Sequence, residues 1–213
     1  MSPEEDKARI EMSHLCASLF ERGFSVGTAG NVSVRLQDGI LMSPTNARLS
    51  DLEPDRISKL DLNGDHIAGD RPTKEVFLHK AFYDTRPEAG AVVHLHSTWA
   101  TAISCLEDTD PDDCIPPLTP YVVMRVGTVK LVPYVKPGDP RSGELIRELN
   151  GRYTAVLLAN HGPIVSGNSL FSAVCAAEEL EETAKLLMAL KGQPVRLLSN
   201  EQVAELKTIF GTI

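Results

Sequence analysis

The sequence is poor in aromatic residues, has no long apolar run and carries no excess of positive charge. Aromatic residues make up 5% of the 213 residues, so a folded core must consist mainly of Leu, Val, Ile and Ala. No apolar run approaches the roughly 20 residues that cross a bilayer as a helix. Asp and Glu number 29 against 21 Lys and Arg, and the formal charge of -8 argues against nucleic acid or an anionic membrane as the main partner. A small anionic substrate is still compatible, because a pocket needs only local positive charge.

Cysteine is also scarce. The chain has four cysteines with no CxxC pair among them: Cys16, Cys105, Cys114 and Cys175. The amino end is acidic where a secretory signal would be basic and then apolar. By elimination, we expect reduced thiols in a cytoplasmic protein.

The hydrophobic pattern predicts helices and strands interleaved in one domain that covers residues 1–213. The expected helices are residues 3–22, 75–83, 97–105, 142–150, 169–190 and 201–210. The expected strands are residues 31–36, 40–42, 57–62, 66–67, 91–95, 129–132, 155–158 and 164–165. Turn residues at 37–39 and 63–64 predict two hairpins, and the Asp- and Pro-rich residues 107–120 predict a loop.

These elements indicate an α/β fold of three layers, with a mostly antiparallel or mixed central sheet covered by helices. Hairpins dominate the first third and βα units do not alternate regularly, so a Rossmann fold is disfavoured. The first helix is expected to begin after Ser2 and to end at Gly23. Its expected buried residues are Ile10, Leu15, Leu19 and Phe20.

Two histidines stand two residues apart at the end of the predicted strand at 91–95, one inside it and one directly after it. Side chains at this spacing point to the same face of a strand, so His94 and His96 can converge on one cation. They could instead be surface histidines or hydrogen-bonded core histidines.

A third histidine, His161, follows the apolar run 155–158 and precedes Gly162 and Pro163, which fix a turn. Three imidazoles with one open coordination position are typical of a catalytic divalent site, most often zinc. The other histidines (His14, His66 and His79) are interpreted as structural or solvent-exposed.

Glu75 begins the helix expected at 75–83. A carboxylate there is favoured by the helix dipole, and an ordinary first-turn Glu is one interpretation. Beside a metal it would be a fourth ligand or a general acid/base. Lys74 is either a solvated charge or, near a pocket, a group that binds a carboxylate or phosphate.

Two small polar loops are candidate phosphate sites. Residues 27–31 read GTAGN, where glycines let backbone N–H groups line a concavity and Thr28 and Asn31 add donors. Residues 43–46 read SPTN. Either loop could equally be a plain turn, since neither matches an established phosphate-binding pattern.

Taken together, five motifs in chain order resemble the class II aldolase/adducin family: GTAGNVS (27–33), SPTN (43–46), PTKE (72–75), HLH (94–96) and NHG (160–162). The longer stretches PTKEVFLH, VVHLHSTWATAISCL, TPYVVMRVG and LLANHGP are more similar to its branch of 3-oxo-tetronate 4-phosphate decarboxylases than to fuculose-phosphate aldolases. The resemblance covers nearly the whole chain and implies the three-layer class II aldolase fold.

The resemblance also implies a site. One divalent ion per subunit, zinc by preference and manganese as an alternative, would be held by His94, His96 and His161, with Glu75 as ligand or acid/base. The implied phosphate and substrate contacts are Thr28, Gly30, Asn31, Thr45, Asn46, Thr73 and Lys74. Tyr121 aligns with a catalytic tyrosine that reaches a neighbouring subunit's site, and a homotetramer with sites near its interfaces is implied.

The implied reaction is decarboxylation of 3-oxo-tetronate 4-phosphate to dihydroxyacetone phosphate and CO2, through an enediolate that the metal stabilises. Thr73 and Lys74 stand where family aldolases commonly carry two serines, and Asn46 stands where fuculose-phosphate aldolases carry glycine. The alternatives are a sugar-phosphate aldolase, an epimerase or dehydratase on the same scaffold, and a non-catalytic interaction module like the adducin head.

Overall fold

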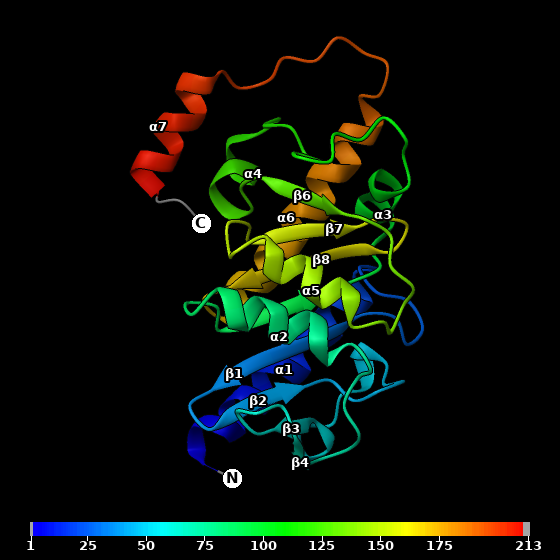
Figure 1. The fold of residues 1–213 in the computed structure, drawn as a ribbon, viewed down its shortest axis with the longest axis vertical. Coiled ribbons are helices and arrows are strands. Elements are labelled where there is room, and N and C mark those ends of the chain that lie inside the picture. Colours follow the sequence, from blue (N-terminus) through cyan, green and yellow to red (C-terminus); the bar gives the residue numbers. More distant parts are fainter. Residues whose placement is uncertain (1, 211–213) are drawn as a thin grey trace.

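The computed structural model describes residues 2–210, in which eight strands form one sheet of order β4-β3-β2-β1-β5-β8-β7-β6 (Figure 1). All neighbouring strands are antiparallel except β6 and β7, which are parallel. The strands are β1 (Asn31–Leu36), β2 (Gly39–Met42), β3 (Ser58–Leu60), β4 (His66–Ala68), β5 (Ala91–His94), β6 (Val129–Val132), β7 (Ala155–Leu158) and β8 (Gly162–Gly167).

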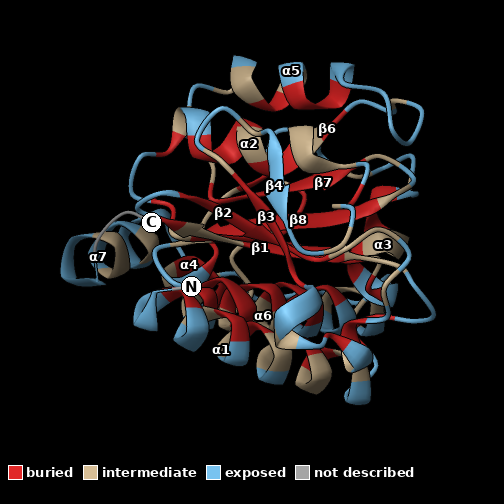
Figure 2. Cartoon of the chain, turned by 90° about the horizontal axis from the view of Figure 1, so that it is seen from below, coloured by how far each residue is buried: buried red, intermediate tan, exposed pale blue. Residues whose placement is uncertain are grey.

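Helices cover both faces of this sheet, which confirms the three-layer α/β prediction. Helices α2 and α5 lie on one face, and α1, α4 and α6 lie on the other (Figure 2). The helices are α1 (Pro3–Glu21), α2 (Val76–Thr85), α3 (Thr98–Ser104), α4 (Pro120–Arg125), α5 (Arg141–Glu148), α6 (Leu170–Ala189) and α7 (Asn200–Phe210). Two short 3-10 turns cover Leu49–Asp51 and Pro54–Arg56.

The sheet separates two apolar cores, one on each face. The buried hydrophobic side chains are aliphatic or sulfur-containing, with Phe24, Phe82 and Tyr83 as the aromatic exceptions among residues 2–210. The aliphatic core expected from the low aromatic content is therefore confirmed. Within that same range, no helix is both long enough and apolar enough to span a membrane.

Helix α1 has the predicted ends, and its predicted buried side is confirmed in part: Leu19 is fully buried, and Leu15 and Phe20 pack against the core. The Ser2 hydroxyl accepts a hydrogen bond from the Glu5 amide at 3.1 Å, as a cap should. Ile10, expected inside, is 50% exposed. The inward stripe also carries polar groups: Arg9 is buried and donates to the carbonyl oxygens of Pro54 and Ile57. Apolar periodicity located the later turns of the inward side and missed the first turns, which are built from buried charge.

The remaining elements agree closely with the pattern, with one omission. Both hairpins form, and no helix or strand interrupts residues 106–119. Helix α4 was not expected. Its six residues are too short for a periodic signal, although Thr119 caps it and Pro120 occupies its first turn, which is a start signature that the sequence does contain.

Candidate active site

Two neighbouring strands bring the three predicted histidines together. His94 ends β5 and pairs with Ile164 of β8, while His96 follows two residues later, before α3. His161 lies in the three-residue turn that connects β7 to β8. The antiparallel pairing of β5 with β8 thus places the end of one strand beside the start of the other.

The turn that carries His161 depends on its glycine. Gly162 has φ of +150°, and a Cβ atom there would lie 2.4 Å from the Leu95 carbonyl oxygen. Only glycine allows β8 to begin so close to β5. Asn160 adopts φ of 56°, a left-handed conformation that asparagine tolerates better than most residues. The local sequence NHG therefore fixes where the His161 ring is carried.

The three Nε2 atoms face one another. They are 3.3 Å apart for His94 and His161, 3.2 Å for His94 and His96, and 3.1 Å for His96 and His161. A tetrahedral zinc ion with Zn–N bonds of about 2.05 Å places its ligand nitrogens about 3.3 Å apart. The cluster could therefore hold one divalent metal ion without moving its ligands far.

The protonation state of the cluster suits a metal. His94 Nδ1 lies 2.8 Å from the Pro163 carbonyl oxygen, which only accepts, so Nδ1 carries the proton and Nε2 presents a lone pair. Burial lowers the pKa of His94 to about 3. Burial also lowers the pKa of His96 and of His161. At neutral pH all three rings are uncharged, as metal ligands must be.

Glu75 brings a carboxylate to the same place. It lies at the N-cap of α2, but its side chain makes no capping hydrogen bond. Its Oε2 is 3.5 Å from His94 Nε2, and its Oε1 is 3.7 Å from His161 Nε2. Burial raises the pKa of Glu75, but the hydrogen bond that the Asn31 amide donates to the carboxylate opposes this, and the pKa lies below its usual value. The group is a carboxylate at neutral pH.

A series of buried, hydrogen-bonded side chains holds Glu75 from the core side. It was not predicted from the sequence. Asn31 Nδ2 donates to Glu75 Oε2 at 2.8 Å, and His79 Nε2 lies 2.5 Å from Asn31 Oδ1. Ser33 and Tyr83 continue the series on the other side of the His79 ring. The signal was present: residues 75, 79 and 83 share one face of α2, while residues 31 and 33 share one face of β1. His79 is buried with a partner at each ring nitrogen, whereas His14 and His66 are exposed.

A second missed carboxylate supports the segment after His96. Glu181 of α6 is buried and accepts hydrogen bonds from the Ser97 hydroxyl and from the amides of Trp99 and Ala100. It supplies from another helix the cap that α3 lacks locally, because Ser97 does not cap its own helix. The position of His96 is fixed by this anchor on one side and by β5 on the other.

The predicted phosphate loops lie next to each other. The Ser43 hydroxyl accepts from the Val32 amide, and the Ser43 carbonyl oxygen accepts from the Thr73 amide. The loops at 43–46 and 72–75 therefore meet beside the start of β1. Of the remaining predicted contacts, Thr28, Asn46 and Lys74 are exposed, Gly30 and Thr45 are half-buried, and both polar ends of the Asn31 amide are engaged by Glu75 and His79.

Tyr121, predicted to reach a neighbouring subunit's site, makes no hydrogen bond or ion pair with the histidine cluster in the described part of the chain. It lies in the first turn of α4 and is 57% exposed.

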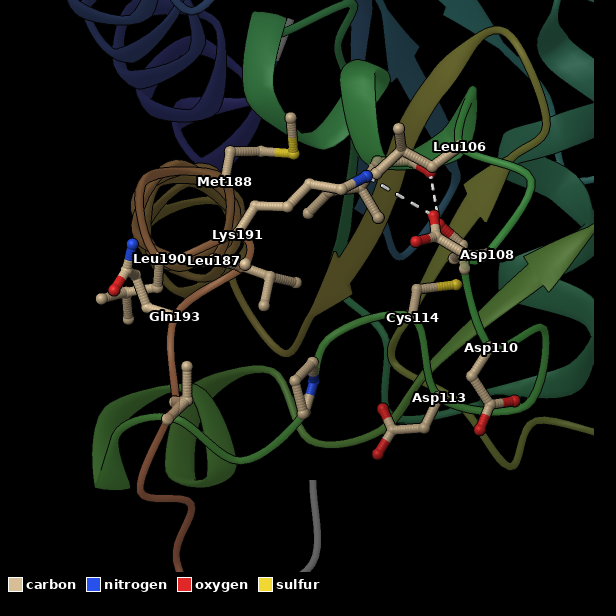
Figure 3. Close-up of a pocket in the computed structure, with 15 residues that line it drawn as sticks. Leu106, Asp108, Asp110, Asp113, Cys114, Leu187, Met188, Leu190, Lys191 and Gln193 are labelled. Atoms are coloured by element: carbon tan, nitrogen blue, oxygen red, sulfur yellow. Dashed lines mark hydrogen bonds and ion pairs between the residues drawn. The ribbon is translucent and has the colours of Figure 1, made fainter.

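Two cavities differ in their relation to the site. A hollow of about 10 Å³, room for about one water, is lined by Glu75 and His161 together with Pro133, residues 135–138 and Ser142, which the sequence did not indicate. A larger cavity of about 450 Å³ lies between the 106–116 loop and the end of α6, where Asp108 faces Lys191 at 3.6 Å (Figure 3). None of the three histidines lines that larger cavity.

The family follows from comparison with known proteins. Residues 10–188 match the family described as Class II Aldolase and Adducin N-terminal domain. The chain belongs to this family.

Its similarity to individual members is high. It is 52% identical to the 3-oxo-tetronate 4-phosphate decarboxylase of Pectobacterium atrosepticum, over 95% of this chain and 93% of that protein. It is 33% identical to the L-fuculose phosphate aldolase of Escherichia coli, over 98% and 96%. The crystal structure of YgbL from Escherichia coli, assigned provisionally as an aldolase, epimerase or decarboxylase, superimposes with a TM-score of 0.93 at 48% identity, covering 95% of this chain and 99% of that chain. The motif-based resemblance, including its closer match to the decarboxylases, is confirmed.

We expect metal binding to fail when one ring is removed. Wild-type protein should bind one zinc ion per chain in competition with a chromophoric chelator. His96→Ala should weaken that affinity more than about 100-fold, the upper end of what changes to outer-shell groups cost. His14→Ala, which removes an exposed histidine from α1, is the matched control and should bind as wild type does. An unchanged affinity in His96→Ala would refute its role as a ligand.

We expect the metal-free protein to lose stability in acid partly through His79. Burial lowers the pKa of His79 to about 4, from 6.5 in the unfolded chain. Between these values the unfolded chain takes up a proton that the folded protein refuses, so the free energy of unfolding falls as pH drops below 6.5, by up to about 3 kcal/mol near pH 4.

The check is urea unfolding of metal-free protein from pH 7.5 to pH 4. His79→Gln cannot titrate, so its stability should fall less steeply than that of the wild type over this range. Identical slopes for the two proteins would show that His79 does not contribute.

Proposed function

We propose that this protein is a metal-dependent carboxy-lyase that converts 3-oxo-tetronate 4-phosphate into dihydroxyacetone phosphate and CO2. The observation that carries the proposal is the convergence of three unprotonated imidazole nitrogens with a carboxylate 3.5 Å from one of them. The name of the relative that is 52% identical over nearly both chains supports the choice of substrate.

The chemistry of this substrate matches the site. Its carboxylate is β to a ketone, so loss of CO2 leaves the bonding electrons in an enediolate, and protonation at C2 gives dihydroxyacetone phosphate. A divalent ion held by His94, His96 and His161, zinc by preference and manganese as an alternative, supplies Lewis acidity that stabilises the negative charge developing on substrate oxygen. Glu75, a carboxylate in the resting site, would take up from solvent the proton that the reaction consumes and deliver it to C2 of the enediolate, either beside the ion or as its further ligand.

Binding of the phosphate and carboxylate is assigned to the loops beside the start of β1. Backbone N–H groups of residues 27–31 are suited to anions because Gly27 and Gly30 have positive φ values of 58° and 80°. Lys74 is exposed, which leaves it free to hold the departing carboxylate or a phosphate oxygen. The other proposed contacts are Thr28, Gly30, Asn31, Thr45, Asn46 and Thr73.

We further propose that the described chain acts as one catalytic domain in a homotetramer with sites near its interfaces. The hollow beside Glu75 and His161 has room for about one water, which is less than a sugar phosphate needs. Tyr121, which is exposed and makes no hydrogen bond to the cluster of its own described chain, is assigned to a neighbouring subunit's site. The four free cysteines fit a reducing compartment, so we place the reaction in the cytoplasm.

A sugar-phosphate aldolase is the second candidate, and the likeness to L-fuculose 1-phosphate aldolase, with a TM-score of 0.87 at 27% identity, favours it. Aldol cleavage can form the same enediolate by releasing an aldehyde. The two reactions therefore share the metal and Glu75 and differ in the group that leaves.

The test is a paired assay of 3-oxo-tetronate 4-phosphate and fuculose 1-phosphate, followed for CO2 and for dihydroxyacetone phosphate. We expect equal amounts of both products from the first substrate, with activity lost to a chelator and restored by zinc. Glu75→Gln should retain its zinc while kcat falls about 10²- to 10⁴-fold. Glu107→Gln, an exposed loop change, is the control. Aldol cleavage without CO2 release would favour the second candidate, and full activity of Glu75→Gln would remove Glu75 from the mechanism.

The shared site has its own test. Glu75→Gln and Tyr121→Phe should each be nearly inactive, because in either homo-oligomer every site lacks one of these two residues. In oligomers formed at random from equal amounts, a site with both Glu75 and Tyr121 intact forms about one time in four, so mixing should restore about a quarter of wild-type activity. No gain on mixing, with mixed oligomers verified by mass, would place both residues in the same subunit's site or remove Tyr121 from it.

A further inference from the structure

A chain of hydrogen bonds leads from Glu75 into the core between α2 and β1. Asn31 Nδ2 donates to Glu75 Oε2 at 2.8 Å, and the other end of that amide, Oδ1, lies 2.5 Å from His79 Nε2. On the far side of the ring, His79 Nδ1 lies 2.8 Å from the Ser33 hydroxyl, which lies 2.7 Å from the Tyr83 hydroxyl. Asn31, Ser33, His79 and Tyr83 are all buried.

The ionised carboxylate sets the direction of every bond in this chain. A carboxylate only accepts, so Asn31 must turn its NH2 group toward Glu75 and its oxygen toward His79. That oxygen needs a donor, so His79 carries its proton on Nε2 and leaves Nδ1 as an acceptor. Nδ1 then accepts from the Ser33 hydroxyl, and Ser33 accepts from Tyr83. Burial raises the pKa of Tyr83, which keeps that hydroxyl a donor.

We propose that His79 is a positioning residue for the reaction: it fixes the Asn31 amide so that its NH2 group holds Oε2 of Glu75 and leaves Oε1 to carry the proton for the substrate. The proposal rests on the function assigned above to Glu75. His79 itself contacts neither the histidine cluster nor the substrate, and it acts only through Asn31.

The arrangement is more specific than core filling requires. His79 is 0% exposed, and a leucine would bury a similar volume without the cost of burying a ring with two polar nitrogens. Both nitrogens have partners, and the Asn31 amide would be free to rotate by a half-turn if His79 did not donate to its oxygen. A rotated amide would set its oxygen against the Glu75 carboxylate, where two acceptors repel.

The experiment compares two variants of His79, each of which keeps one of the ring's two hydrogen bonds, either to Asn31 or to Ser33. The amide of glutamine reaches the position of Nε2, so His79→Gln can still donate to Asn31. The shorter amide of asparagine reaches only the position of Nδ1, so His79→Asn keeps a partner for Ser33 and loses the contact with Asn31. We expect kcat to fall about 10- to 100-fold in His79→Asn and to stay within about 3-fold of wild type in His79→Gln, with KM and zinc content unchanged in both.

A double-mutant cycle separates positioning from damage to the fold. If His79 acts through Asn31, adding His79→Asn to Asn31→Ala should lower kcat no further, whereas independent structural damage would add to the loss. Equal losses in His79→Gln and His79→Asn, wild-type kcat in His79→Asn, or additive losses in the cycle would each overturn the proposal. The kcat ratios are measured on whichever substrate the wild type turns over. Failure of the decarboxylase assignment is therefore seen in the products, and failure of the positioning role is seen in the ratios.

A second measurement needs neither activity nor a variant that folds. In wild-type protein labelled with 15N at histidine, the resonances of His79, assigned by their loss in His79→Gln or through long-range couplings within α2, report which ring nitrogen carries the proton. We expect the neutral Nε2–H form at pH 7.5 in both the metal-free and the zinc-loaded protein. A Nδ1–H or a doubly protonated ring would overturn the proposal.

Discussion

The structure depends on holding three nitrogen lone pairs within 3.3 Å of one another. Like dipoles at that distance repel unless a cation lies between them, so the rest of the fold must supply the constraint in the metal-free chain. It does so through backbone: the Pro163 carbonyl accepts from His94 Nδ1 and also from the Leu95 amide. One carbonyl oxygen thereby sets the tautomer of a ligand and the pairing of its strand.

The apolar layers make this constraint rigid. The three histidines have fully buried aliphatic residues next to them in the sheet, among them Val93, Leu95 and Leu157. Side chains packed at crystal-like density leave little freedom for strand ends to separate. The polar supports, Glu181 under α3 and the chain from Glu75 to Tyr83, are satisfied within that packing. A catalytic centre on this scaffold is held precisely, because the polar residues that support it are as buried as the core.

Sequence alone predicted the sheet and the ligands for different reasons. Hairpins were predictable because Asp-Gly and Asn-Gly turns determine their own geometry, and β7, β8 and α6 were predictable from apolar runs and a Ser169 cap. The spacing of His94 and His96 predicted a shared face, and His161 was linked to them by its position between an apolar run and a Gly-Pro turn, which the family motif then supported. Six-residue α4 lacked a period, and the first turns of the inward side of α1 were missed because buried Glu5 and Arg9 stand where an apolar stripe would continue.

The supports of the site were harder to predict than its ligands. His79 and Glu181 lie in helices whose periodicity explained their neighbours. The shared face of residues 75, 79 and 83 marks a polar stripe, but it does not say which strand the stripe contacts. The partners of His79 and Glu181, Asn31 on β1 and Ser97 before α3, lie 48 and 84 residues away along the chain. Only tertiary structure joins them.

The account's central claim is that one divalent ion is bound by the Nε2 atoms of His94, His96 and His161. Anomalous diffraction at the zinc edge, from crystals of the protein grown with zinc, measures this directly. We predict one peak per chain at about 2.0–2.1 Å from each of the three nitrogens. A well-ordered cluster without a peak, or a zinc ion bound only elsewhere on the chain, would contradict the account.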